Sequence, residues 1–518
     1  MRRAIDLGVT DFRDIIYWSK VESESESYSF DKLTTIYPEE IAASGGRMSL
    51  TLNWGNELHD AGETPFTPEG RAAFARFAEA ALDAHPAISA VEVGNEFNGQ
   101  NFVTGPVKDV SREERASQHF ELLKAVYLRV KASHPKVAVL GGAAHSIPGG
   151  YIWPLLDLGG ADYMDALVLH PYTTPPEQLA RQIAVLRRHP QASDLPLQVT
   201  EFGEKGRAEA PSFLMRMYCA MALSGVERAA WYPLHDRGDG LEPLIDTHSG
   251  RPTDTGRVFA RVQKMMAGRP VRDVSPDPFT IACLFGEDTL VIWGARRAVW
   301  IADGIEATNA LGVTLDKVLL ELSESDPIIL TADERIVLGE DVKLEPTGIL
   351  ADSYHQFSYP TEDETFASAD PFQRFARHKD RRVPLRTMPG QEAQGTPWTP
   401  YLGNRHYRPA RLLADSLVPG GSDTNPVEIV HRYVADTKRV VALEASWNPS
   451  ERSQDGVEIT VLLNGKVLEH KSSVRDRYSV ALPEIPMWRG ARLDIVVGPG
   501  GNSSGDVTEY RIVLREAR

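Results

Sequence analysis

Leu197-Gln198-Val199-Thr200-Glu201-Phe202-Gly203 decides the fold, because an apolar strand closes here on a carboxylate just before a glycine. A second run, Ala90-Val91-Glu92-Val93-Gly94-Asn95-Glu96, has the same form and also ends on a glutamate. The carboxyl ends of parallel strands gather at one edge of a sheet or barrel. The two runs therefore predict that Glu96 and Glu201 meet at one end of a parallel-stranded fold.

The composition is that of a globular protein and argues against two classes of function. The chain has 518 residues, of which 42% are hydrophobic and 25% charged, and this length suits roughly two to four domains. A net charge of -16 argues against nucleic-acid binding, which depends on neutralising phosphates. The chain has no run of roughly 18 apolar residues, so we predict no membrane span.

The two cysteines give no sign of a disulfide framework or a metal site. Cys219 and Cys283 fall in segments that we assign to different domains. The chain has no CxxC motif and no Cys/His pattern for zinc. We therefore expect neither a metal nor a cofactor.

Apolar strands alternate with helical segments up to about residue 268. The predicted strands cover residues 12–18, 48–54, 88–96, 137–141, 166–170, 197–201 and 229–232. Helix starts are marked by Thr67-Pro68 and by Ser111, which forms a capping box with Glu114. This alternation is typical of a (β/α) barrel or a doubly wound sheet. Because no GxGxxG or P-loop motif follows a strand, we predict a TIM barrel with the catalytic site, over residues 1–268.

Polar and aromatic side chains occupy the ends of the predicted strands. The candidates for substrate binding are Arg13, Trp54, Asn95, His170, Tyr172 and Trp231. Aromatic faces stack on sugar rings, and amides and carboxylates bind sugar hydroxyls, so an oligo- or polysaccharide is the expected partner. Other interpretations stay open: Arg13 is equally suited to pair with Glu92, and both tryptophans could fill the core. His170 could also be a core histidine, and Tyr172 an ordinary loop tyrosine. We interpret His145, at another strand end, as structural.

These strand ends carry a family resemblance. Asn95-Glu96 and the later Thr200-Glu201-Phe202-Gly203 resemble the retaining glycoside hydrolases whose acid/base glutamate ends strand 4 and whose nucleophile ends strand 7. Within that clan the chain is most similar to glycoside hydrolase family 39, in particular its bacterial exopolysaccharide-cleaving members, through the stretches 8–13, 18–22 and 52–56. The resemblance covers roughly residues 1–332. The usual Trp-Asn-Glu-Pro is replaced here by Gly94-Asn95-Glu96-Phe97.

The resemblance implies a double displacement with Glu96 as general acid/base and Glu201 as nucleophile. Such enzymes hold the two carboxyl groups about 5 to 5.5 Å apart. We expect the charge of Glu201 to raise the pKa of Glu96, Arg13 and Tyr172 to keep Glu201 ionised, and Asn95 to bind the sugar 2-hydroxyl. The resemblance favours endo cleavage of β-linkages in a bacterial polysaccharide. An exo-acting β-xylosidase-like glycosidase and a non-catalytic glycan-binding protein are the alternatives.

The N-terminus bears on strand numbering and on localisation. The glutamates end the third and sixth visible strands, so the match to four and seven requires that strand 1 is missing at the N-terminus. Residues 1–7 lack the apolar segment of a signal peptide and are predicted to end a helix capped near Gly8. Family members are commonly exported, so the resemblance implies a periplasmic or secreted protein even though no signal peptide is visible.

Two β-rich regions follow the barrel. We expect a small β-sandwich packed on the barrel over residues 269–345 and an irregular connecting segment over residues 346–420. Residues 421–518 alternate in polarity and contain the hairpin signal Asn464-Gly465, which predicts a jelly-roll-like β-sandwich. A carbohydrate-binding module and a structural appendage are both open for this last region.

Overall fold

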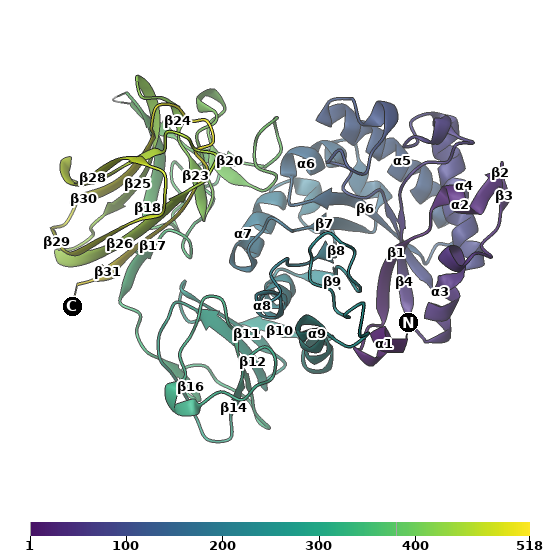
Figure 1. Cartoon of the computed structure of the whole chain (residues 1–518), viewed down its shortest axis with the longest axis horizontal. Helices are drawn as coiled ribbons and strands as arrows, with labels where there is room; N and C mark the ends of the chain where they lie inside the picture. Colours follow the sequence, from purple (N-terminus) through teal and green to yellow (C-terminus); the bar gives the residue numbers. More distant parts are fainter. Residues whose placement is uncertain (1, 380, 518) are drawn as a thin grey trace.

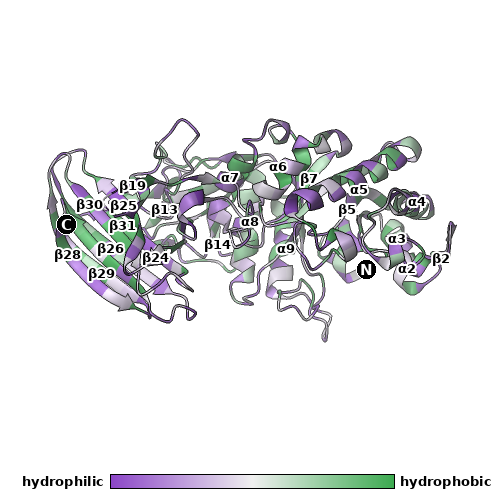
Figure 2. Cartoon of the chain, turned by 90° about the horizontal axis from the view of Figure 1, so that it is seen from above, coloured by the Kyte–Doolittle hydropathy of each residue, from purple (hydrophilic) through white to green (hydrophobic). Residues whose placement is uncertain are grey.

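The computed structural model describes residues 2–379 and 381–517, which form three successive units (Figure 1). The first unit is a parallel sheet surrounded by helices, and the other two are built from antiparallel strands. The N-terminus lies at the barrel end of the molecule, and the C-terminus lies at the opposite end, in the third unit (Figures 1 and 2).

The first unit contains a seven-stranded parallel sheet. Its strands are β1 (Asp11–Ile15), β4 (Arg47–Leu52), β5 (Ile88–Val93), β6 (Ala138–His145), β7 (Ala166–His170), β8 (Leu197–Phe202) and β9 (Val226–Trp231), paired in that order. Strands β5 to β8 are almost entirely buried, as expected for a sheet whose other face is covered by helices. Among the described residues, the edge strands β1 and β9 pair only with β4 and β8. The predicted barrel-type fold with seven visible strands is therefore confirmed.

Helices surround this sheet and begin where the sequence signals predict. They are α1 (Arg2–Asp6), α2 (Trp18–Val21), α3 (Leu33–Ala43), α4 (Pro68–Ala84), α5 (Arg112–Ser133), α6 (Gly149–Asp157), α7 (Pro176–Leu186), α8 (Ala210–Leu223) and α9 (Asp254–Met265), with a hairpin of β2 (Glu22–Glu24) and β3 (Ser27–Tyr28) after α2. Thr67 accepts the backbone N–H of Gly70 (3.0 Å) and Ser111 that of Glu114 (3.1 Å), which confirms both N-caps. No described helix is both long and apolar enough to cross a membrane.

The second unit packs one face of its sheet against the barrel. Its strands are β10 (Val271–Asp273), β11 (Thr280–Phe285), β12 (Thr289–Gly294), β13 (Val299–Ile301), β14 (Glu306–Thr308), β15 (Ile328–Thr331) and β16 (Val342–Leu344). Side chains alternate between the faces of a strand. Phe285 and Trp293 therefore join the barrel core, whereas Leu284 and Ile292 belong to the unit's own core.

A disulfide crosses this contact between the first and second units. It joins Cys219 of α8 to Cys283 of β11, whose Cα atoms are 6.2 Å apart, and both residues are fully buried. The expectation that the cysteines form no disulfide framework was wrong, because the packing of β11 on α8 brings the two Cα atoms within the reach of a disulfide.

The third unit is a two-sheet sandwich that begins earlier than predicted. Its strands are β17 (Ile349–Asp352), β18 (Phe372–His378), β19 (Arg381–Pro384), β20 (Arg386–Met388), β21 (Tyr401–Gly403), β22 (Arg411–Leu412), β23 (Ser416–Val418), β24 (Gly420–Ser422), β25 (Asn425–Val434), β26 (Arg439–Pro449), β27 (Val457–Leu463), β28 (Lys466–Val474), β29 (Tyr478–Met487), β30 (Arg492–Pro499) and β31 (Thr508–Glu516). Residues 346–420 are not an irregular connection, because β17 pairs with β31 and β18 with β25. Most of these strands have only two to four residues, and β17, β18 and β23 pair with strands far along the chain, so local patterning did not reveal them.

The long strands of the sandwich alternate in polarity, as Figure 2 shows for β25, β26 and β31. Strands β27 and β28 form the predicted hairpin, whose turn residues Asn464 and Gly465 have φ values of 50° and 85°.

Glu177, in the first turn of α7, ties the three units together. Its Oε1 accepts hydrogen bonds from Arg216 of α8 (2.6 Å) and from the indole of Trp293 in the second unit (2.8 Å). Its Oε2 accepts the hydroxyl of Tyr354 in the third unit (2.9 Å). One barrel carboxylate thus holds both β-rich units against the same helix.

Candidate active site

Glu96 lies in a tight turn directly after β5. Gly94 has φ 86° and Glu96 has φ 43°, both in the left-handed region. A Cβ on Gly94 would lie 2.7 Å from the ring of Phe97, so this close turn requires glycine. Phe97 is buried and stacks on His119 with ring centroids 4.4 Å apart, and His119 Nε2 donates to the carbonyl of Val93 (2.9 Å). Where the family has Trp-Asn-Glu-Pro, this chain thus has a turn that requires glycine and that packs against the stacked rings of Phe97 and His119.

Glu201, near the end of β8, is held by a cation and a hydroxyl. Arg13 of β1 donates to Glu201 Oε1, and the Tyr172 hydroxyl donates to Glu201 Oε2 (3.0 Å). Arg13 also donates to Glu92 Oε2 (2.7 Å) and to Asn95 Oδ1 (2.7 Å). Arg13 therefore pairs with Glu92 and also binds Glu201, the two roles that the sequence suggested, because one guanidinium contacts three site residues.

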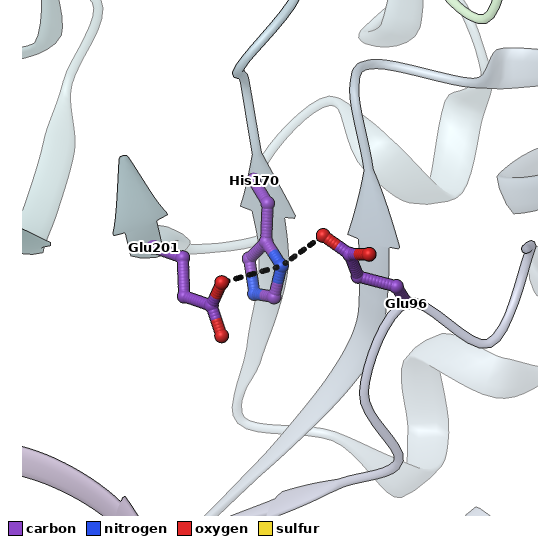
Figure 3. Close-up of side chains that lie close together, drawn as sticks. All are labelled: Glu96, His170 and Glu201. Atoms are coloured by element: carbon purple, nitrogen blue, oxygen red, sulfur yellow. Dashed lines mark hydrogen bonds and ion pairs between the residues drawn. The ribbon is translucent and has the colours of Figure 1, made fainter. Parts of the chain in front are cut away.

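His170 lies between the two predicted catalytic glutamates (Figure 3). Its Nδ1 is 3.3 Å from Glu96 Oε1 and 3.8 Å from Glu201 Oε2. Its Nε2 is 2.9 Å from Thr200 Oγ1, and the ring is fully buried. One carboxylate oxygen of Glu96 and one of Glu201 lie within 4.8 Å of each other and of a His170 nitrogen. The structure therefore brings Glu96, His170 and Glu201 into one cluster.

The imidazole of His170 is the strongly basic group of this cluster. Burial alone would lower its pKa, but the charge of Glu201 and hydrogen bonds to Glu92 and Glu96 raise the pKa to about 9. Burial also raises the pKa of the Tyr172 hydroxyl, with Glu201 adding to the effect. Tyr172 is therefore a hydrogen-bond donor to Glu201 at neutral pH.

The pKa of Glu96 departs from the expectation. Burial would raise it, but hydrogen bonds from His145 and His170 lower the pKa to about 2. The prediction that the charge of Glu201 raises the pKa of Glu96 was wrong, because the hydrogen bonds from two imidazoles outweigh the effect of burial. In this cluster the proton at neutral pH resides on His170, next to Glu96.

His145 is a site residue that the sequence analysis set aside as structural. It ends β6, and its Nδ1 lies 3.0 Å from Glu96 Oε1. Its ring stacks on that of Tyr172 with centroids 5.7 Å apart. Its place at a strand end was a signal that could have identified it.

The remaining predicted binding residues lie at the same end of the barrel but differ in exposure. Asn95 is 7% exposed, and its amide oxygen is taken by Arg13. Trp54 follows β4, is partly exposed and packs on Phe102 at 6.0 Å. Trp231 is also only 7% exposed and lies edge to face on Phe202 at 5.1 Å. Sugar stacking by either tryptophan stays a prediction, and the burial of Trp231 leaves little of its ring for a ligand.

The cluster has the donor atoms of a metal site but carries positive charge of its own. Glu96, His170 and Glu201 place three donor atoms within 4.8 Å of one another. A cation there would have to compete with Arg13 and with protonated His170, which already bind these carboxylates. The arrangement is better suited to proton transfer and nucleophilic attack than to metal ligation.

Comparison with known proteins supports the fold. No family model matches the chain, and no curated protein sequence matches it. A family 39 glycoside hydrolase from the gut symbiont Bacteroides cellulosilyticus WH2 is similar in structure, with a TM-score of 0.54 and 20% identity over 64% of this chain and 77% of that one. A GH39 β-xylosidase from Caulobacter crescentus gives a TM-score of 0.46 at 14% identity over 64% of this chain and 91% of that one. The first likeness shows that this chain shares the fold of a family 39 enzyme, as the sequence resemblance implied.

Proposed function

We propose that this chain is a retaining glycoside hydrolase with Glu96 as acid/base and Glu201 as nucleophile. The observation that carries the proposal is the approach of a Glu96 oxygen to within 4.8 Å of a Glu201 oxygen at one end of the barrel. Retaining enzymes hold their carboxyl groups about 5 to 5.5 Å apart, whereas inverting enzymes leave about 6.5 to 9.5 Å for a water molecule. The spacing therefore favours direct attack by Glu201.

In the first step Glu201 attacks the anomeric carbon. A covalent bond forms between a Glu201 oxygen and that carbon, while the bond from the carbon to the leaving oxygen breaks and this oxygen takes a proton from Glu96. Arg13 and the Tyr172 hydroxyl donate hydrogen bonds to Glu201 and orient it for this attack. The NH2 group of Asn95 forms no hydrogen bond with the described residues, so it is available for the sugar 2-hydroxyl.

The proton that Glu96 delivers is held beforehand by His170. Glu96 Oε1 accepts it from His170 Nδ1 across 3.3 Å as the leaving oxygen arrives. The charge of Glu201 is the largest cause that raises the pKa of His170. When Glu201 becomes a neutral ester, that cause is lost, and the proton is driven toward the leaving group. In the second step Glu96 removes a proton from water, whose oxygen bonds to the anomeric carbon as the bond from that carbon to Glu201 breaks, and the proton then returns from Glu96 to His170.

For the substrate we propose endo cleavage of β-linkages in a bacterial polysaccharide, acted on in the periplasm or outside the cell. The family resemblance supports the linkage and the polymer. The net charge of -16 makes a strongly anionic glycan unfavourable. The buried Cys219–Cys283 disulfide supports an oxidising compartment.

A Glu201→Gln variant tests whether the protein is an enzyme or only a glycan binder. We expect wild-type protein to release reducing ends from at least one member of a panel of bacterial exopolysaccharides. Glu201→Gln should lose this activity by a factor of about 1000 or more, because an amide is a poor nucleophile, yet keep binding. Glu204→Gln is the matched control and should stay active, because the Glu204 carboxylate accepts the backbone N–H groups of Lys205 and Gly206 in its own loop. Equal activity of Glu201→Gln and wild type would contradict the proposal.

A further inference from the structure

A loop of the third unit docks on the rim of the candidate active site. Residues 389–400 connect β20 to β21, and Figure 1 shows β20 facing the barrel near α6. The backbone N–H of Gly149 donates to the carbonyl of Pro389 (2.9 Å), and that of Gly150 donates to the carbonyl of Gly390 (2.8 Å). The loop is therefore bound to the N-terminus of α6, at the end of the barrel that holds Glu96.

Gln391 anchors this loop to the segment that presents Glu96. Asn98 Nδ2 donates to Gln391 Oε1 (2.8 Å), and Gln391 Nε2 donates to the carbonyl of Asn98 (3.0 Å). Asn98 also bonds the backbone of His145 in both directions, at 2.8 and 3.1 Å. Gln391 is 4% exposed and Asn98 2%. A buried amide pair thus fixes the loop relative to Glu96.

The anchored loop carries Trp398 to the Glu96 side of the site. The rings of Trp398 and His145 are nearly perpendicular, with centroids 5.5 Å apart, and His145 Nδ1 lies 3.0 Å from Glu96 Oε1. Trp398 is 38% exposed, so part of its ring is free to bind a ligand. A Cβ built on Gly99 would lie 3.6 Å from this ring, so the backbone at Gly99, three residues after Glu96, lies beside the indole with no side chain between them.

We propose that Trp398 stacks on the sugar that leaves, the first unit beyond the scissile bond. This proposal rests on the proposed function and deepens it. Glu201 attacks the anomeric carbon of the sugar on one side of the scissile bond. Glu96 protonates the oxygen that leaves with the sugar on the other side. A ring that adjoins Glu96 through His145 therefore faces the departing sugar. The third unit then completes the substrate site, and the substrate extends to both sides of the cleaved bond.

The test compares substrates with and without a leaving-group sugar. Trp398→Ala, Trp398→Phe and wild type are assayed on the neutral β-linked tetrasaccharide that the enzyme hydrolyses, chosen from xylotetraose, cellotetraose, laminaritetraose and mannotetraose. The β-glycosyl fluoride of the same sugar is the second substrate, because fluoride leaves without a sugar. We expect Trp398→Ala to lower kcat/KM about tenfold on the tetrasaccharide and less than about twofold on the fluoride. Trp398→Phe should recover most of the loss.

Two further variants separate stacking from folding. Trp488→Ala removes another exposed tryptophan of the third unit and should leave both substrates unaffected. Gln391→Ala loosens the loop without touching the indole and should reproduce the selective loss on the tetrasaccharide. Equal losses on both substrates for Trp398→Ala, or no loss on either, would overturn the proposal.

A binding measurement distinguishes failure of this proposal from failure of the proposed function. Calorimetric titration of Glu201→Gln with the four tetrasaccharides should detect binding that the added Trp398→Ala change weakens about tenfold. If the Trp398→Ala change alters neither hydrolysis nor binding, this proposal alone is overturned. If none of the four is bound or hydrolysed, this proposal is overturned, and the proposed function fails as well if no exopolysaccharide is cleaved.

Discussion

His170 Nδ1 lies 3.3 Å from Glu96 Oε1, so a buried, protonated imidazole donates a hydrogen bond to the proposed acid catalyst. The pKa of His170 is raised to about 9 mainly by the charge of Glu201 against the effect of burial. The pKa of Glu96 is lowered to about 2 by hydrogen bonds from His145 and His170, again against burial. On the proposed assignment, acid catalysis by Glu96 thus depends on His170.

This dependence predicts the alkaline limb of the pH–rate profile. As pH rises through about 9, His170 loses its proton, and wild-type activity should fall with it. His170→Asn should lower kcat by about 100-fold at neutral pH and move the alkaline limb to lower pH, as measured by kcat against pH. His189→Asn, which removes a histidine paired with Asp157 at 3.1 Å outside the site, is the control and should keep the wild-type profile. A wild-type profile in His170→Asn would count against His170 as the source of the proton.

Removal of the acid/base carboxyl gives a second prediction. Glu96→Ala should lower kcat about 100- to 10,000-fold on substrates with poor leaving groups, and much less on dinitrophenyl glycosides, whose leaving group needs no proton. Added azide should restore turnover by attacking the glycosyl enzyme in place of activated water. The product, identified by NMR, should be a β-glycosyl azide. An α-glycosyl azide, or no rescue with either class of substrate, would argue against Glu96 as acid/base.

Arg13 is predicted to be important for stability as well as activity. Its bonds to Glu92 compensate a carboxylate that is fully buried. Arg13→Leu removes the guanidinium partner of that buried charge and should cost about 3 to 5 kcal/mol in the free energy of unfolding, measured by urea denaturation. Arg47→Leu breaks an exposed pair with Asp11 at 3.0 Å and should cost less than about 1 kcal/mol. Similar losses in the two variants would contradict the role given to Arg13.

The disulfide between the first two units predicts a redox-dependent stability. Cys219 and Cys283 are separated by 64 positions, and a crosslink over a loop of this size contributes about 2 to 4 kcal/mol. The double Cys→Ser variant should unfold at lower urea concentration than oxidised wild type, and dithiothreitol should shift only the wild type. Two free thiols in the oxidised, denatured wild-type protein would show that the bond does not form.

The proposed catalytic pair could be predicted from sequence because barrel topology brings strand ends together. Glu96 and Glu201 each close an apolar run, and Arg13 and Tyr172 were found from the same reasoning about the remaining strand ends. The pKa of Glu96 could not be inferred in this way, because it depends on where the rings of His145 and His170 lie. Those positions follow from the register of β6 on β7, which apolar patterning does not specify.

Contacts between units were beyond local sequence reasoning. Residues 346–420 contain strands as short as Arg411–Leu412, and three strands of this region, β17, β18 and β23, have partners far along the chain. Gln391 and Trp398 come from this stretch, and only docking of the third unit places them beside Asn98 and His145. The Cys219–Cys283 pair likewise depends on the packing of one unit on another.

Covalent trapping of Glu201 tests the central claim most directly. A panel of 2,4-dinitrophenyl 2-deoxy-2-fluoro-β-glycosides slows both steps but keeps the activated leaving group, so a glycosyl enzyme accumulates. We predict that intact-mass analysis shows the gain of one fluoroglycosyl unit and that peptide mapping places it on Glu201. An enzyme that hydrolyses the parent glycosides yet acquires no label, or acquires it on another residue, would contradict the account.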